Sequence, residues 1–199
     1  DDVTKALPMI TGGHVDAVCF EALSELTLAI LQKDRLANPA RGYTFDLNII
    51  ARQILPEAYK RKIPLITNGG GLNPLAAAEM MRETAEKLGL YGIKIAAITG
   101  DDVLARLSEL QAAGEPFTNL DTGEAIAKTL NQQFMAANVY LGAAPIVQAL
   151  HAGADIVITG RVADPCLYLA PLIAHYGWEW GNWNMLASGI VAGHLLECT

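Results

Sequence analysis

Short apolar runs of strand length alternate along the chain with longer stretches in which apolar residues recur at helical spacing. The strand-like runs lie within residues 15–20, 63–66, 93–98, 133–142 and 154–159. Strands that alternate with helices predict right-handed crossovers and a mostly parallel sheet that is buried on both faces. The pattern therefore predicts an α/β fold of the Rossmann-like kind, with about five strands, helices on both faces and a single domain over residues 1–199.

Glycine and aspartate residues mark where several of the predicted helices begin and end. Gly12 and Gly13 follow a helical pattern over residues 3–11, and Asp46 is placed to cap a later helix. Residues 112–122 are polar and rich in turn-forming residues, unlike the segments around them. We interpret them either as a surface excursion or as a lid over the site.

A triplet of glycines in "LITNGGGLNP" separates the strand run at 63–66 from a helix that Pro74 starts. A glycine run costs backbone entropy, so it indicates a positive φ or a close approach to the main chain. In a parallel sheet such a loop lies at the carboxyl end of its strand, where ligands bind and where free amides suit an anion. The alternative is a tight turn that brings the helix close onto the sheet.

Three of the predicted strands run into polar loops, and a fourth is tipped by Glu21. Because parallel strands end at the same edge of a sheet, we expect Gly70, Gly100 and Gly160 to lie along one edge. The candidate ligand-binding residues of these loops are Asn68, Gly69, Gly70, Gly71, Asn73, Thr99, Gly100, Thr159, Gly160 and Arg161. The candidate acid/base residues are Glu21, Asp101, Asp102, Asp164 and His194.

The charged residues of these loops each allow two interpretations. Arg161 is a natural fork for a carboxylate or a phosphate, or else it forms a salt bridge to Asp164. Asp101 and Asp102 could hold a divalent cation or act as a base, but an aspartate that follows a glycine is also an ordinary helix cap. Asp164 and the proline after it fit the first positions of a helix.

Neither nucleotide fingerprint is present, because no G-x-G-x-x-G follows a strand and no G-x-x-x-x-G-K-[ST] occurs. We therefore expect no cofactor and leave dinucleotide binding as an alternative.

His194 and Glu197 lie three residues apart, so on a helix they share one face and could form an acid/base pair or two ligands of a metal. We expect no tightly held zinc, because no C-x-x-C pair is present. Cys166, at a predicted helix start, is a weak candidate nucleophile.

Composition narrows the classes of partner. The net charge is −7 without any Lys/Arg cluster, which argues against nucleic acid and against an anionic membrane surface. Three widely spaced cysteines fit a reducing cytoplasm. We expect a small-molecule substrate and a homo-oligomer or a subunit of a complex. The sequence opens without Met and stops directly after an apolar helical pattern, so we expect a fragment cut at both ends.

Seven segments spread over the chain resemble the acyclic terpene utilisation proteins of the AtuA type. They are "VCFEALSELTLA", "ITNGGGLNPLAAAE", "ITGDDV", "LDTGE", "ANVYLGAAPIV", "GADIVITGRVADPCLYLAPL" and "GIVAGHLLEC". The resemblance implies the amino-terminal domain of that family and a cytoplasmic role in degrading acyclic terpenes such as citronellol and geraniol. Their intermediates are handled as coenzyme A thioesters, so an acyl-CoA is a candidate substrate. The resemblance supplies neither a reaction nor a set of catalytic residues.

We therefore expect an enzyme that acts on a branched acyl substrate, with lyase or hydratase chemistry preferred over redox chemistry. In this interpretation the amides of Gly69 to Gly71 and the Arg161 side chain hold the anionic part of the ligand. The alternative is a non-catalytic binding or assembly subunit of a terpene-degrading complex. Strongly perturbed pKa values at the strand ends would favour the enzyme, and a large exposed apolar patch would favour the subunit.

Overall fold

The computed structural model describes residues 3–125 and 134–198, and its centre is a parallel sheet. Its strands are β1 (Val18–Phe20), β2 (Leu65–Thr67), β3 (Ile95–Ile98) and β4 (Ile156–Thr159), in the order β1-β2-β4-β3. All three neighbouring pairs are parallel, with Thr67 opposite Ile158 and Ile98 opposite Thr159. The predicted α/β class and the parallel sheet are confirmed.

The fifth predicted strand, at 133–142, is wrong for the residues that the structure describes; residue 133 lies outside them. The segment makes only single bridges, from Asn138 to Asp102 and from Leu141 to Val162. It crosses the loops beyond β3 and β4 instead of lying beside a strand. Its amides bind loop carbonyls, so their hydrogen bonds are met without a ladder.

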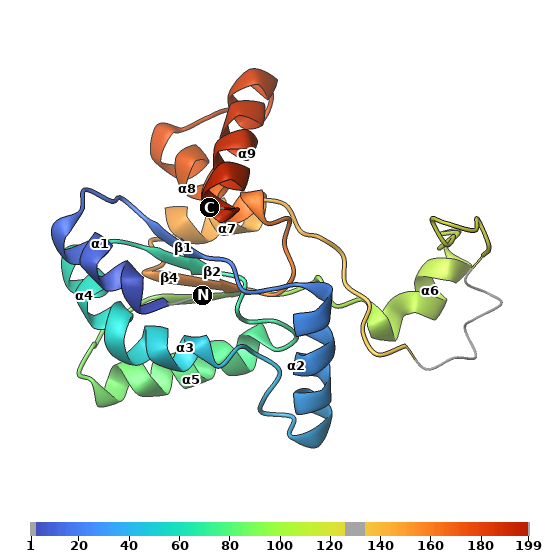
Figure 1. The fold of residues 1–199 in the computed structure, drawn as a ribbon, viewed down its shortest axis with the longest axis horizontal. Helices are drawn as coiled ribbons and strands as arrows, with labels where there is room; N and C mark the ends of the chain where they lie inside the picture. Colours follow the sequence, from blue (N-terminus) through green and yellow to red (C-terminus); the bar gives the residue numbers. More distant parts are fainter. Residues whose placement is uncertain (1–2, 126–133, 199) are drawn as a thin grey trace.

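Helices cover both faces of the sheet, as the sequence predicts. One face carries α1 (Ala6–Gly12), α3 (Asp46–Ile49), α4 (Leu55–Arg61) and α5 (Pro74–Lys87), and the other carries α7 (Ala144–His151), α8 (Pro165–Tyr176) and α9 (Trp183–Glu197) (Figure 1). Short 3-10 turns lie at Val3–Lys5 and Leu104–Arg106. No helix in the described parts of the chain combines the length and the apolar character needed to cross a membrane.

Alternate strand residues supply two separate cores. Leu65 of β2 packs into the core under α1, α4 and α5, whereas the next residue, Ile66, packs into the core under α7 and α8. In β4, Ile156 and Ile158 join the first core and Val157 joins the second. Because successive side chains of a strand point to opposite faces, an apolar run buries both sides of the sheet.

The predicted helix after Asp46 is interrupted by a π-helical turn at Ile50–Ile54. Pro56 follows at the start of α4, where it has no amide hydrogen and its ring would meet the carbonyl one turn earlier. A wider turn relieves this conflict. Asp46 is the first helical residue and Phe45 stands at the cap position without a side-chain bond, so the predicted Asp46 cap is wrong.

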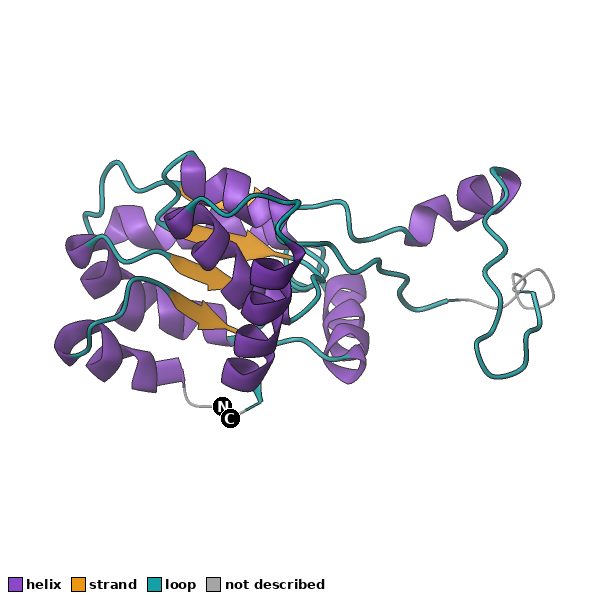
Figure 2. Ribbon diagram, turned by 90° about the horizontal axis from the view of Figure 1, so that it is seen from above, coloured by secondary structure: helices purple, strands orange, loops and turns teal. Residues whose placement is uncertain are grey.

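Two helices lie beyond the carboxyl ends of the strands. α2 (Glu25–Ala37) stands across that end, and α6 (Leu107–Ala112) belongs to an arm that projects away from the sheet (Figures 1 and 2). Residues 112–122 are part of this arm. Of the two interpretations of that segment, the structure shows the surface excursion.

Candidate functional site

The loops after β2, β3 and β4 meet at the carboxyl edge of the sheet, toward which the strand arrows in Figure 2 point. A Cβ built on Gly70 would lie 2.5 Å from the carbonyl oxygen of Thr159. A Cβ built on Gly160 would overlap the carboxylate of Asp101. The structure thus places Gly70, Gly100 and Gly160 along one edge, as the sequence predicts.

The glycine triplet is a buried turn that packs against its surroundings. The amide of Gly69 donates to Thr67 Oγ1 at 2.9 Å, and the amide of Gly71 donates to the Asn68 carbonyl at 3.0 Å. Gly71 has a φ of +54°, which disfavours any side chain there. This geometry favours the tight turn over a cradle of free amides for an anion.

Asn68 joins the ends of β1 and β2. Its side chain is fully buried, donates to Glu21 Oε1 at 3.0 Å and accepts from the Ala22 amide at 2.8 Å. The same Glu21 oxygen accepts from the Leu23 amide at 2.7 Å. Glu21 is therefore held at the sheet edge with one oxygen engaged. Asn73 lies further along and caps α5 through the Ala76 amide.

Asp101 joins the ends of β3 and β4. Its side chain is only 2% exposed, and its Oδ2 accepts from the Arg161 amide at 2.7 Å and from Asn138 Nδ2 at 2.9 Å. A buried carboxylate that accepts two short hydrogen bonds from different loops holds those loops together. Asp101 thereby fixes the crossing segment around Asn138 onto the sheet edge.

Asp102 turns away from Asp101 and serves the helical turn that follows. Its Oδ1 accepts from the Leu104 amide at 3.1 Å, and its Oδ2 forms an ion pair with Arg35 at 3.1 Å. The two aspartates thus have separate partners, and the capping interpretation fits Asp102. Thr99 and Gly100 are exposed next to them, whereas Thr159 is buried and donates to the Gly160 carbonyl.

Arg161 is the buried cation of this edge, with 4% of the residue exposed. Its Nη1 donates to the Leu23 carbonyl at 2.8 Å and lies 3.3 Å from Asp164 Oδ1. Its Cζ lies 4.1 Å from the centre of the Tyr140 ring. The salt bridge to Asp164 is the alternative that the sequence left open. The buried Nε has no hydrogen-bond partner among the described residues.

Asp164, the ion-pair partner of Arg161, also feels the negative charge of three other carboxylates. We call the four the acidic cluster: Glu21, Glu25, Asp164 and Glu197. Burial raises the pKa of Asp164 against the opposite effect of Arg161, and the three other carboxylates raise it further. Tyr140 donates to Glu25 Oε1 at 2.6 Å, which lowers the pKa of Glu25. Asp164 therefore keeps its proton to higher pH than an ordinary aspartate does.

Glu25 and Tyr140 belong to this site but were not predicted from the sequence. Glu25 is the first residue of α2, and no pattern connects it to a strand end. Tyr140 belongs to the segment predicted as a strand, so its position over Arg161 depends on how that segment crosses the sheet edge. Only its place in the quoted "ANVYLGAAPIV" motif signalled it.

The cysteines near this edge are not activated. Cys19 is partly buried and donates to the Leu167 carbonyl at 3.1 Å, and removal from water raises its pKa to about 12. Burial also raises the pKa of Cys166, the weak candidate nucleophile. Tyr168 is half-buried beside them, and burial followed by the neighbouring negative charges raises its pKa to about 12.

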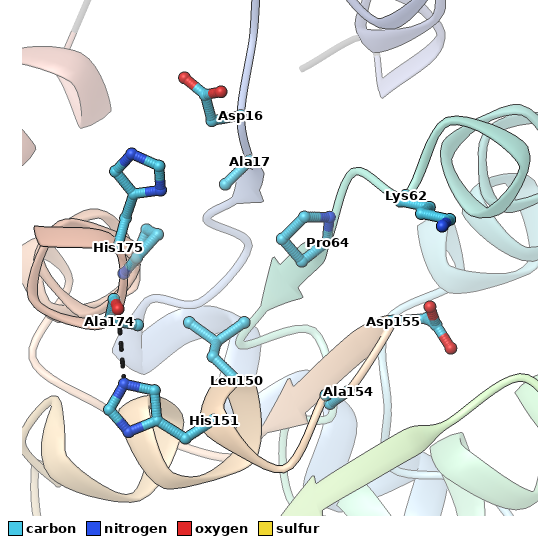
Figure 3. Close-up of a pocket in the computed structure, with 12 residues that line it drawn as sticks. Asp16, Ala17, Lys62, Pro64, Leu150, His151, Ala154, Asp155, Ala174 and His175 are labelled. Carbon is cyan, nitrogen blue, oxygen red and sulfur yellow. Dashed lines mark hydrogen bonds between the residues drawn. The ribbon is translucent and has the colours of Figure 1, made fainter.

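A hollow of about 370 Å³ lies at the opposite, amino-terminal edge of the sheet (Figure 3). Its lining includes Asp16 before β1, Lys62 before β2, Asp155 before β4, and His151 and His175. Asp155 accepts from the Lys94 amide at 2.7 Å, and His151 contacts the Ala174 carbonyl at 3.4 Å. Asp155 and His151 thus contact the main chain, and ligands of open parallel sheets bind at the other edge.

The comparisons with known proteins agree with the resemblance seen in the sequence. The family described as acyclic terpene utilisation family protein AtuA matches over residues 1–199. No curated protein and no solved structure matches the chain. Since the match spans all of the sequence, the chain belongs to the acyclic terpene utilisation family AtuA.

Proposed function

We propose that the protein is a cytoplasmic enzyme of acyclic terpene degradation that acts on a branched acyl or acyl-CoA substrate by hydratase or lyase chemistry. The observation that supports this most is Asp164, a partly exposed carboxyl group with a raised pKa between a buried guanidinium and three further carboxylates. Free thiols at Cys19, Cys166 and Cys198 fit a reducing compartment.

Adding or removing water needs one group that donates a proton and another that accepts one. In the proposal Asp164 donates, because burial and neighbouring charge favour its protonated form. Glu21 is held at the end of β1 by Asn68 and the Leu23 amide, and it is the acceptor candidate. His194 is 66% exposed, which makes it a candidate for proton exchange with water.

Arg161 is the group proposed to hold the anionic part of the substrate. Its Nε, which has no hydrogen-bond partner in the described parts of the chain, offers a donor next to the Asp164 ion pair, and a guanidinium binds carboxylate or phosphate in a fixed geometry. Asp101 and Asp102 were candidate acid/base residues, but their contacts make them supports of the loops. The glycine triplet likewise supports the edge and is not proposed to touch the ligand.

A second candidate function, a non-catalytic subunit of a terpene-degrading complex, is favoured by the outer face of α9. This helix buries Leu186, Gly189 and Gly193 but leaves its other apolar side chains in solvent, with Trp183 75% and Leu195 61% exposed. Apolar surface of this kind marks association surfaces in soluble proteins. Turnover of a thioester substrate distinguishes the two functions, because only the enzyme converts it.

The proposal is tested with coenzyme A thioesters of the branched acids derived from citronellol and geraniol, by following gain or loss of water with mass spectrometry. We expect Asp164→Asn to lower kcat roughly 10²- to 10⁴-fold, the range of general acid catalysis. Arg161→Ala should weaken substrate binding by about 1.5–3 kcal/mol. The matched control is His175→Ala, at the opposite edge, which should leave both quantities unchanged.

Two results would count against the enzyme. Thioester binding without any turnover would favour the assembly subunit, particularly if changes on α9 such as Leu195→Ser alter the oligomeric state. Turnover that is equal in the wild type and in Asp164→Asn would mean that another group moves the proton. Either result leaves the family membership intact.

A further inference from the structure

Three different metal-ligating side chains come together at the carboxyl end of α9: His194, Glu197 and Cys198. One ligand atom from each lies within 4.8 Å of the other two. Glu197 Oε2 lies 3.1 Å from Cys198 Sγ and 3.7 Å from His194 Nδ1, and His194 Nε2 lies 3.9 Å from the same sulfur. The three-residue spacing of His194 and Glu197 predicts a possible metal-binding pair, and the structure adds the Cys198 thiol to it.

We propose that these three residues form an exchangeable site for a divalent ion of the Zn²⁺ or Co²⁺ type. Bond lengths of about 2.0–2.3 Å at tetrahedral angles put neighbouring ligand atoms about 3.3–3.6 Å apart. The Glu197–Cys198 separation of 3.1 Å lies close to these values. The 3.7 and 3.9 Å distances from His194 involve its two different nitrogens, and with one nitrogen the three ligand atoms lie within 4.8 Å of one another. Binding one ion therefore requires the exposed imidazole to turn toward both partners.

The donor set selects the class of ion. One imidazole, one carboxylate and one thiolate are typical ligands of zinc and of cobalt, whereas magnesium and calcium prefer oxygen ligands alone. Only three protein ligands are present among the described residues, so the fourth position is open to water or to a ligand. A three-ligand site near the surface exchanges its metal readily, which is consistent with expecting no tightly held zinc.

α9 packs closely on α8, which holds in place the main chain that carries the three ligands. Glycines at 189 and 193 let the two helices approach closely, since a Cβ on Gly193 would lie 2.9 Å from the Pro165 carbonyl and one on Gly189 would lie 2.5 Å from Leu169 Cδ1. Glu197 is also a member of the acidic cluster, so the local field attracts a cation. A main chain that is already in place and a negative field both favour binding of a cation.

Cobalt(II) titration of the purified, chelator-treated protein tests the site without any acyl substrate. We expect one Co²⁺ per chain, with a near-ultraviolet absorption band from thiolate-to-cobalt charge transfer that zinc abolishes on addition. Cys198→Ser should remove the band, and His194→Ala and Glu197→Gln should each weaken binding by at least about 10- to 100-fold. Cys166→Ser is the matched thiol control and should keep the band.

Absence of the band in excess cobalt would overturn the proposal, as would equal binding by the wild type and by a His194→Ala, Cys198→Ser double variant. A band lost in Cys166→Ser but kept in Cys198→Ser would place the metal elsewhere. All three ligands lie at the end of the helix, and circular dichroism checks that each variant folds. Failure of this test leaves the proposed chemistry at Asp164 unaffected, because substrate turnover is measured separately.

Discussion

The two edges of the sheet differ in whether their polar residues are buried or exposed. At the carboxyl edge Asn68, Asp101 and Arg161 are buried, and their hydrogen bonds join neighbouring loops, as from the Arg161 amide to Asp101 and from the Ala22 amide to Asn68. At the amino-terminal edge Asp16 and His175 are exposed around an open hollow. A concave surface is easily formed between helix ends, whereas burying charge is costly unless partners are built for it.

The difference shows that burial and pairing of polar groups identify a functional edge better than a hollow does. At the carboxyl edge, burial first and then the charge of three neighbouring carboxylates raise the pKa of Asp164, against the opposite effect of Arg161. A chain selected for stability alone gains nothing from such a cluster. Substitutions at the two edges should therefore have different effects, and the largest differences should be in stability.

The largest expected effect is that of Asp101→Ala. This change removes the acceptor of the buried Arg161 amide and of the Asn138 side chain, leaving two donors without partners. Each unsatisfied group costs about 1–3 kcal/mol, so we expect a loss of about 3 kcal/mol in the free energy of unfolding, measured by urea denaturation. Asp16→Ala at the opposite edge should stay within about 0.5 kcal/mol. Equal losses would remove the contrast between the edges.

The next effect concerns the glycine turn. A Cβ at Gly70 would lie 2.5 Å from the Thr159 carbonyl and 3.0 Å from Pro74 Cα, both main-chain atoms that cannot move aside. Gly70→Ala should therefore cost about 1–3 kcal/mol of stability, measured by thermal unfolding, while ligand affinity stays the same in the fraction that folds. The matched control is Gly12→Ala in α1, where nothing lies within 4 Å and Ala should stabilise the helix by about 0.5–1 kcal/mol.

The opposite outcome for Gly70→Ala would be equally informative. A folded variant with normal stability and weakened ligand binding would mean that the amides of the triplet contact the ligand after all. The edge would then use its main chain as well as its side chains for recognition.

Much of this edge could be predicted from the sequence, because strand ends and turn residues are local signals. The apolar runs at β2, β3 and β4 and the polar residues directly after them place Asn68, Asp101 and Arg161 at one edge. The structural roles of these three residues were harder to predict, because the hydrogen bonds that join the loops depend on partners that are distant in the sequence. Asn138, 37 residues after Asp101, is such a partner.

The crossing segment shows why the remainder could not be predicted. Its alternating apolar residues fit a strand, but Leu141 bonds the loop residues Arg161 and Ala163. Tertiary contacts therefore decide its conformation over local propensity. The position of Tyr140 over Arg161, and with it the environment of Glu25, follows from that path.

The smallest expected effect is the pH dependence of stability that Asp164 contributes. Its folded-state pKa is raised above the ordinary 3.8, first by burial, so the folded protein holds this proton to higher pH than the unfolded chain does. The stability that this proton contributes is present below pH 3.8 and is lost as the pH rises through the folded-state pKa. Asp164→Asn, which cannot ionise, should therefore become more stable relative to the wild type as the pH rises through this range.

Urea denaturation of chelator-treated protein at several pH values measures this difference. Glu79→Gln on α5 provides a control of opposite sign, because the hydrogen bond from Arg82 lowers the pKa of Glu79. The stability that ionised Glu79 contributes is present at neutral pH and lost as the pH falls, so that variant should become less stable relative to the wild type as the pH rises. If Asp164→Asn follows the same direction as Glu79→Gln, the ion pair with Arg161 outweighs burial. Asp164 would then be a fixed carboxylate that positions Arg161, and the proton donor of the proposed reaction would have to be another residue of the edge.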